Sequence, residues 1–353
     1  MDQPGLAGIE LARGFHRDVI GPLLARETPR LRYAAGRLGS GSDVLGFDDD
    51  MSRDHDWGCR LTVLVDEIDG GRIEELRRLL ERELPKTYAG MPVRFPTTWD
   101  PTAGHKVEVA TAIGFAESRL GLMPRAELSA IEWLSLTGQS ILEVTAGPIF
   151  HDTTSETEQV RRWLGWYPPD VERYVLASAW QRVTQQLPFV GRTAERNQEY
   201  QSRLLSLRLT EDLARIAFLL HRRWAPYAKW FEKAFRALPL ADLLIEPLSM
   251  TTDGDWRVRE RGLGAAAREL LRLQRELGFA TPDTGIIAFW DRPYLTIAPE
   301  IPQALLAPIT DPELTALPAG IGSIEQWVDN TDVLAHPERR RAVIATYRAW
   351  LAR

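Results

Sequence analysis

Two aspartates separated by one residue, Asp54 and Asp56, open a stretch in which polar and apolar residues alternate. In a β-strand, residues two apart point to the same side, so these carboxylates would lie one pleat apart on the polar face. Carboxylates at that spacing can hold two divalent cations roughly 3.5–4 Å apart, as in phosphoryl and nucleotidyl transfer. Mg²⁺ prefers carboxylate oxygens, water and substrate phosphates. The pair therefore predicts a site for two Mg²⁺ ions, with Mn²⁺ as an alternative.

A glycine and a serine upstream of this pair, Gly41 and Ser42, have the chemistry of a phosphate contact. A glycine lets the backbone come close to a phosphate, and a hydroxyl with backbone N–H groups can hold its oxygens. Gly39 and Ser40 form an overlapping pair of the same composition. The sequence leaves open whether Ser42 or Ser40 makes the contact.

A third carboxylate, Glu108, lies inside a second alternating segment at residues 105–110. It faces away from Val107 and Val109 and shares its side of the strand with Lys106. If the two strands are neighbours, Glu108 can approach the paired aspartates. We expect it to bind one metal and to orient or deprotonate the attacking hydroxyl.

The elements that must position these residues change in character along the chain. Residues 6–27, 72–84 and 125–136 have helical spacing, whereas 54–65, 105–110 and 139–150 are predicted to be extended. The second half of the chain is dominated by long helical patterns, with one short hairpin at 285–297. These helical patterns cover residues 170–187, 195–224, 226–237, 263–277 and 338–352. The pattern predicts an α/β half followed by a mostly helical half.

Composition narrows the class of protein. The chain has 353 residues, 44% of them hydrophobic, and a formal net charge of -6. Such a chain is globular, with two domains expected at roughly 100–200 residues each. A negative net charge argues against a nucleic-acid partner, because neutralising phosphates needs a surplus of Lys and Arg, although a local basic groove stays open.

The single cysteine, Cys59, is expected to be a small core residue. One cysteine excludes an internal disulfide and a structural zinc site, so the cytoplasm is the expected location. No apolar run approaches the ~18 residues that span a bilayer, so no membrane partner is expected. The consecutive acids Asp48, Asp49 and Asp50 are interpreted as a solvated loop rather than a metal cluster.

Gly41-Ser42, Asp54-His55-Asp56 and Glu108, in this order, resemble the pattern of the DNA polymerase beta-like nucleotidyltransferase superfamily. The longer strings GSGSDVLGFDDDMSRDHDWG, EVTAGPIFHD and FVGR are similar to its DUF4037 branch, and this resemblance covers most of the chain. His55 departs from the pattern, because the residue between the paired aspartates is usually aliphatic. It would face the buried side of the strand, away from the metals.

The resemblance implies an α+β fold with two domains. Residues 1–155 would form the nucleotidyltransferase domain, a mixed sheet flanked by helices, and residues 156–353 a mostly α-helical domain that closes over nucleotide and acceptor. Residues 240–330 are left as a helical extension or a small extra lobe.

The resemblance also implies contacts from the helical half. Superfamily members often place a lysine of the second domain on the triphosphate, a role that Lys229 could fill. Arg192 is a candidate contact to phosphate or acceptor. Glu195 and Glu211 are both candidates for an extra catalytic base, and the sequence does not choose between them.

The resulting hypothesis is a Mg²⁺-dependent nucleotidyltransferase. It would transfer a nucleoside monophosphate, AMP from ATP, to a hydroxyl of a small molecule and release pyrophosphate. Two alternatives stay open: AMPylation of a protein, as in toxin-neutralising relatives, and nucleotide sensing without turnover.

Overall fold

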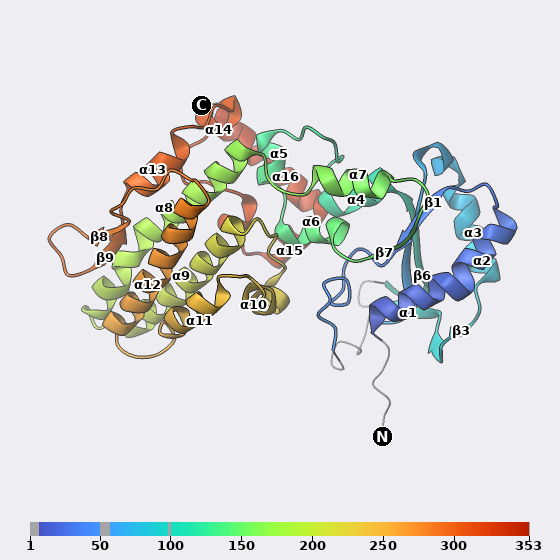
Figure 1. The fold of residues 1–353 in the computed structure, drawn as a ribbon, viewed down its shortest axis with the longest axis horizontal. Coiled ribbons are helices and arrows are strands. Elements are labelled where there is room, and N and C mark those ends of the chain that lie inside the picture. The colour runs from blue at the N-terminus through green and yellow to red at the C-terminus, as the bar shows by residue number, and fades with distance from the viewer. Residues whose placement is uncertain (1–6, 50–56, 98–99, 353) are drawn as a thin grey trace, which may run out of the picture. The chain divides into compact units, whose positions relative to one another are not determined.

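The computed structural model describes residues 7–49, 57–97 and 100–352 (Figure 1). The chain divides into two compact units that are interleaved in sequence. The first contains Met1–Glu127 and Ser140–Gly165, and the second Leu128–Gln139 and Trp166–Arg353. The described residues do not include the predicted metal ligands Asp54 and Asp56, nor His55 and Asp50.

A five-stranded mixed sheet forms the centre of the first unit, in the order β5-β6-β2-β1-β7. Strand β6 pairs with β2 in parallel, and the other pairs are antiparallel. The strands are β1 (Tyr33–Gly36), β2 (Arg60–Val65), β5 (Arg94–Thr97), β6 (Asp100–Thr111) and β7 (Ile149–Asp152). With the helical second unit, this confirms the predicted α+β class with a mixed sheet flanked by helices.

One face of this sheet forms the hydrophobic core of the first unit. Val63 and Val107 from adjacent strands are 1% and 4% exposed, and they pack with apolar residues of α1, α2 and α3. Figure 1 shows these helices beside the sheet. The helices of this unit are α1 (Gly8–Phe15), α2 (Gly21–Glu27), α3 (Ile73–Glu83), α4 (Ala112–Leu120), α6 (Gly138–Thr145) and α7 (Glu156–Trp163), with a π-helical turn at His16–Ile20 and a 3-10 turn at Glu67–Arg72.

Two sequence-based boundaries were wrong within the described residues. Residues 139–150 were predicted to be extended, but most of them form helix α6, whose Ile141 and Val144 are buried three residues apart. The strand predicted from residue 54 begins at Arg60 in the described part of the chain. Just before it, a Cβ on Gly58 would lie 2.8 Å from the ring of Phe95, so the chain passes against that ring before it enters the sheet.

The second unit is built around two long helices that pack against each other, α8 (Pro169–Ala194) and α9 (Glu199–Leu220). Trp180 and Leu209 are fully buried in their core. The predicted hairpin is confirmed as β8 (Ile286–Ala288) paired with β9 (Leu295–Ile297). The other helices are α5 (Ala130–Leu134), α10 (Ala228–Arg236), α11 (Ala241–Ser249), α12 (Trp256–Glu276), α13 (Glu300–Leu306), α14 (Pro312–Ala316), α15 (Thr331–Ala335) and α16 (Pro337–Leu351).

The region 240–330 shares a core with the long helices. Leu244 of α11, Leu263 of α12 and Ile297 of β9 belong to the same buried cluster as Trp180. None of the helices among the described residues combines the length and the apolar character needed to cross a membrane.

Candidate functional site

Glu108 lies on the face of the sheet opposite the hydrophobic core. It pairs in register with Thr62 of β2, and Thr62 pairs with Gly36, the last residue of β1. The side chains of Val107 and Val109 point to the core face, as the alternation predicted. The strand of Glu108 is therefore a direct, parallel neighbour of the strand that follows the Asp54–Asp56 segment.

A buried ion pair shapes the turn that follows β1. Arg37 donates from Nε to Asp43 Oδ2 at 2.7 Å and from Nη2 to Asp43 Oδ1 at 2.9 Å. Arg37 Nη2 also donates to the carbonyl oxygen of Ser40 at 2.8 Å, and Asp43 Oδ1 accepts from the Val44 amide at 3.0 Å. The side chains of Arg37 and Asp43 are 3% and 10% exposed. The Gly-Ser segment is thus wrapped around a fixed charge pair.

Gly41 passes directly over this pair. Its φ of +142° lies in a region that favours glycine, and a Cβ here would lie 2.2 Å from Asp43 Oδ1 and 2.5 Å from Arg37 Nη2. The requirement for glycine at this position therefore has a local structural cause, in addition to any approach of a phosphate.

The two candidate serines differ in their surroundings. Ser40 is exposed, and its carbonyl is held by Arg37. Ser42 is half-buried, and its carbonyl accepts from the Phe47 amide at 2.8 Å. Neither hydroxyl bonds to another residue in the described ranges, so both remain candidates for the phosphate contact.

Arg119 of α4 is the site residue that sequence reasoning missed. Its Nη2 lies 2.5 Å from Oε2 of Glu108, and its Nε lies 3.7 Å from Oε2 of Glu143. The guanidinium carbon sits 4.7 Å from the ring centroid of Phe115. Nothing in the local sequence marks this arginine among 43 Lys and Arg residues, because only the fold brings it to Glu108.

Glu108 has the chemistry of a ligand for a hard cation. A carboxylate oxygen is the donor that Mg²⁺ prefers, and the side chain is 39% exposed, so solvent can reach it. No three His, Cys, Asp or Glu residues gather into a metal-binding group within residues 7–49, 57–97 and 100–352. A set of three such ligands that includes Glu108 would therefore need a residue outside these ranges, and Asp54 and Asp56 are the predicted ones.

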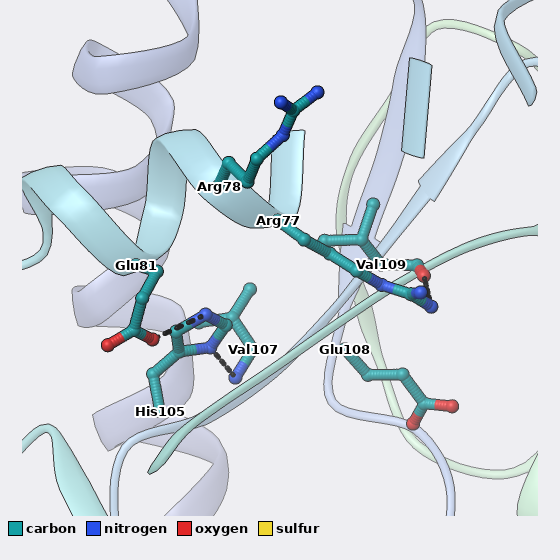
Figure 2. Close-up of a pocket in the computed structure, with 7 residues that line it drawn as sticks. All are labelled: Arg77, Arg78, Glu81, His105, Val107, Glu108 and Val109. Atoms are coloured by element: carbon teal, nitrogen blue, oxygen red, sulfur yellow. Dashed lines mark hydrogen bonds and ion pairs between the residues drawn. The ribbon is translucent and has the colours of Figure 1, made fainter. Parts of the chain in front are cut away.

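A hollow of about 350 Å³ lies at the edge of β6 (Figure 2). Arg77 Nη2 donates to the carbonyl of Val109 at 3.0 Å, and His105 Nδ1 accepts from the Val107 amide at 3.3 Å. Figure 2 shows the Glu108 carboxylate directed away from Arg77 and His105. The hollow is lined by Arg77, Arg78, Glu81, His105, Val107, Glu108 and Val109.

The contacts of Arg77 and His105 with the backbone of β6 explain the polar residues of this hollow without a ligand. Strand β5 pairs with β6 only as far as His105, so beyond that residue this side of β6 has no strand partner among the described residues. Backbone groups exposed there could pair with another chain, and side chains that occupy those groups block such pairing. Arg77 and His105 do this for β6. Burial lowers the pKa of His105, which keeps its ring neutral and able to accept from Val107 near pH 7. The Glu108 carboxylate and the turn after β1 therefore remain the predicted reacting centre.

Lys229 and Arg192 both lie in the second unit. Lys229 of α10 is exposed, with Nζ 5.2 Å from the ring centroid of Trp230. Arg192 of α8 lies over the ring of Phe289, 5.3 Å from its centroid. Their roles at phosphate remain predictions. The two candidate bases already have partners, because Glu195 accepts from the Tyr294 hydroxyl and Glu211 pairs with Arg215 at 2.9 Å.

The structure also tests the predictions for Cys59 and Asp48. Cys59 is fully buried in the core, as predicted, and burial raises the pKa of its thiol to about 11. Asp48 was interpreted as a solvated loop acid, but its Oδ2 accepts from the Gly8 amide at the start of α1 at 2.9 Å. Asp48 therefore anchors a helix.

Two comparisons with known proteins found a similarity, and a third found no match. A family model described as "Domain of unknown function (DUF4037)" matches residues 133–231. The crystal structure of a nucleotidyltransferase-like protein from Exiguobacterium sibiricum 255-15 is similar at 12% sequence identity, over 76% of this chain and 78% of that chain, with a TM-score of 0.33. No curated protein matches the chain. The function must be argued from the residues of the site.

Proposed function

We propose that this protein is a Mg²⁺-dependent nucleotidyltransferase that transfers AMP from ATP to a hydroxyl of a small molecule. The observation that carries the proposal is the parallel pairing of β2 with β6. It sets Glu108 beside the strand that follows the Asp54–Asp56 segment and in register with the end of β1, where the Gly-Ser turn begins.

In this proposal the carboxylates divide the work. Asp54 and Asp56 would hold two metal ions, and Glu108 would complete the ligand set for one of them. Mg²⁺ at such a site would neutralise phosphate charge and lower the pKa of the attacking hydroxyl. The acceptor oxygen forms a bond to the α-phosphorus, the bond from that phosphorus to the bridging oxygen breaks, and pyrophosphate leaves. Glu108 accepts the proton of the hydroxyl and passes it to solvent.

The remaining residues position the nucleotide. The turn at Gly41 and Ser42 holds the β- and γ-phosphates, and the buried Arg37–Asp43 pair keeps that turn in one conformation. Lys229 and Arg192 would supply further positive charge to the phosphates. Catalysis then rests mainly on positioning and charge neutralisation, as in phosphoryl transfer generally.

Label transfer tests this function. The protein is incubated with α-³²P-ATP, Mg²⁺ and a panel of compounds that carry hydroxyl and amino groups, and labelled products are separated. We expect Asp54→Asn, Asp56→Asn and Glu108→Gln to reduce transfer by roughly 10²–10⁴-fold, because each removes a carboxylate from the reacting centre. Asp49→Asn, in the neighbouring acidic loop, is the matched control and should retain activity.

The location of the label identifies the acceptor. Label on a small molecule supports the proposal, whereas label on a protein band in a cell extract would assign the acceptor to a protein. Undiminished transfer in all three carboxylate variants would contradict the two-metal chemistry. Tight Mg²⁺–ATP binding with no pyrophosphate released would favour a nucleotide sensor.

A further inference from the structure

Arg119 lies between Glu108 and the Gly-Ser turn, which are the two described parts of the proposed site. Its Nη2 contacts the Glu108 carboxylate at 2.5 Å, and the same nitrogen lies 3.5 Å from the position that a Cβ on Gly39 would occupy. Gly39 begins the Gly-Ser segment, has a φ of +84°, and donates from its amide to the carbonyl of Glu143 at 2.8 Å. One guanidinium therefore lies between the predicted metal ligand and the predicted phosphate turn.

The guanidinium is held in place from several sides. Phe115, one turn earlier on α4, lies under it at 4.7 Å, and the Glu143 carboxylate lies 3.7 Å from its Nε. The Arg119 side chain is 25% exposed, so one side of the group still faces solvent. Glu143 and Phe115 would keep Arg119 in this position even if Glu108 turned away.

The short contact to Glu108 creates a competition. Oε2 of Glu108 accepts from Arg119 at 2.5 Å, and a metal ion would compete with this guanidinium, which is also a cation, for the single negative charge of the carboxylate. Loading of a cation at Glu108 therefore weakens or breaks this pair. A guanidinium that loses a carboxylate seeks another anion, and its planar set of donors matches phosphate oxygens.

We propose that Arg119 is a phosphate-binding residue that changes partner during loading of the site. Without metal it neutralises Glu108, and with metal on Glu108 it donates to a phosphate oxygen of the nucleotide held at the Gly39–Ser42 turn. This inference rests on the proposed function. It adds a residue that the sequence pattern does not contain, and it couples metal and nucleotide binding through one side chain.

The change of partner by Arg119 is tested by measuring the affinity of the protein for Mn²⁺ and its affinity for Mg²⁺–ATP, which should change in opposite directions when Arg119 is replaced. Mn²⁺ binding is measured by electron paramagnetic resonance without nucleotide, and Mg²⁺–ATP binding by isothermal titration. For Arg119→Ala we expect Mn²⁺ to bind about 2- to 5-fold more tightly, because a partly exposed competitor for Glu108 is gone. We expect ATP to bind roughly tenfold or more weakly, because a charge-assisted hydrogen bond is lost. Arg119→Lys should restore part of the ATP affinity.

Controls separate this role from a structural one. Arg77→Ala removes an arginine that contacts β6 through Val109, and it should change neither affinity. A fall of both affinities in Arg119→Ala, or no change in either, would overturn the inference. If the wild-type protein binds ATP and transfers label while Arg119→Ala behaves like wild type, only this inference fails. If the wild type binds no nucleotide, the proposed function fails with it.

Discussion

At the scale of single residues, the buried Arg37–Asp43 pair sets the geometry of the turn that we assign to phosphate binding. Asp43 lies five residues before the consecutive acids Asp48–Asp50, and the sequence alone does not show that it has a buried partner. In the structure its charge is neutralised by Arg37, so it adds nothing to the acidity of the proposed metal site. A residue pair six positions apart in an irregular turn has no periodic signature that could have revealed it.

This pair predicts a large effect of one substitution on stability. Asp43→Ala leaves the Arg37 charge buried without its carboxylate, so we expect the free energy of unfolding to fall by about 3 kcal/mol. Chemical denaturation measures the change. The control is Glu10→Ala, which removes the exposed partner of Arg13 at 3.5 Å and should cost less than about 1 kcal/mol. Equal losses in the two variants would contradict a structural role for the pair.

The orientation of Glu108 could be predicted and the position of Arg119 could not. Alternation along a strand fixes which side a residue faces, and Val107 and Val109 marked the core side. The contact between Arg119 and Glu108 depends instead on where α4 lies against the sheet. That placement is a product of tertiary packing, and no local pattern carries it.

At the scale of elements, strong periodicity gave correct predictions and short apolar runs did not. The amphipathic helix at 72–84 is α3, and the alternating segment at 105–110 lies within β6. The segment 139–150 was wrong because its few apolar residues fit a strand and a buried helix equally well. Ile141 and Val144 are both buried three residues apart, which fits one side of a helix, and the segment forms α6.

The contact between helix α12 and the hairpin predicts a pH-dependent stability. Glu260 accepts from the Leu295 amide of β9 at 2.9 Å, and burial raises the pKa of its carboxyl to about 7. The folded state therefore holds this proton more tightly than the unfolded state, whose carboxyl titrates near pH 4.3. The stability that this proton contributes is present at pH 4 and is lost as the pH rises to 7.

A glutamine at this position removes the titration and keeps a hydrogen-bond acceptor. We expect Glu260→Gln to be about 3–4 kcal/mol more stable than the wild type at pH 8 and equal to it at pH 4, in thermal or chemical unfolding. Glu269→Gln, on the same helix and paired with Arg272 at 3.0 Å, is the control for the substitution itself. A constant difference across this range would contradict the assignment.

At the scale of the whole molecule, the predicted α+β class is confirmed, but neither composition nor motifs predicted the interleaving of the two units. The segment Leu128–Gln139 leaves the first unit and joins the second before the chain returns. This exchange follows from long-range packing, such as the bond from the Tyr347 hydroxyl to the Leu134 carbonyl at 3.3 Å. A linear pattern of helices and strands cannot show it.

The central claim is that Asp54, Asp56 and Glu108 hold two metal ions on one nucleotide. The most direct test counts bound Mn²⁺ by electron paramagnetic resonance, with a non-hydrolysable ATP analogue and no acceptor. We predict two bound Mn²⁺ ions per chain in the wild type with the analogue present, and fewer in Asp54→Asn, Asp56→Asn and Glu108→Gln, with Asp49→Asn unchanged. An equal number of bound ions in the wild type and all three carboxylate variants would contradict the account.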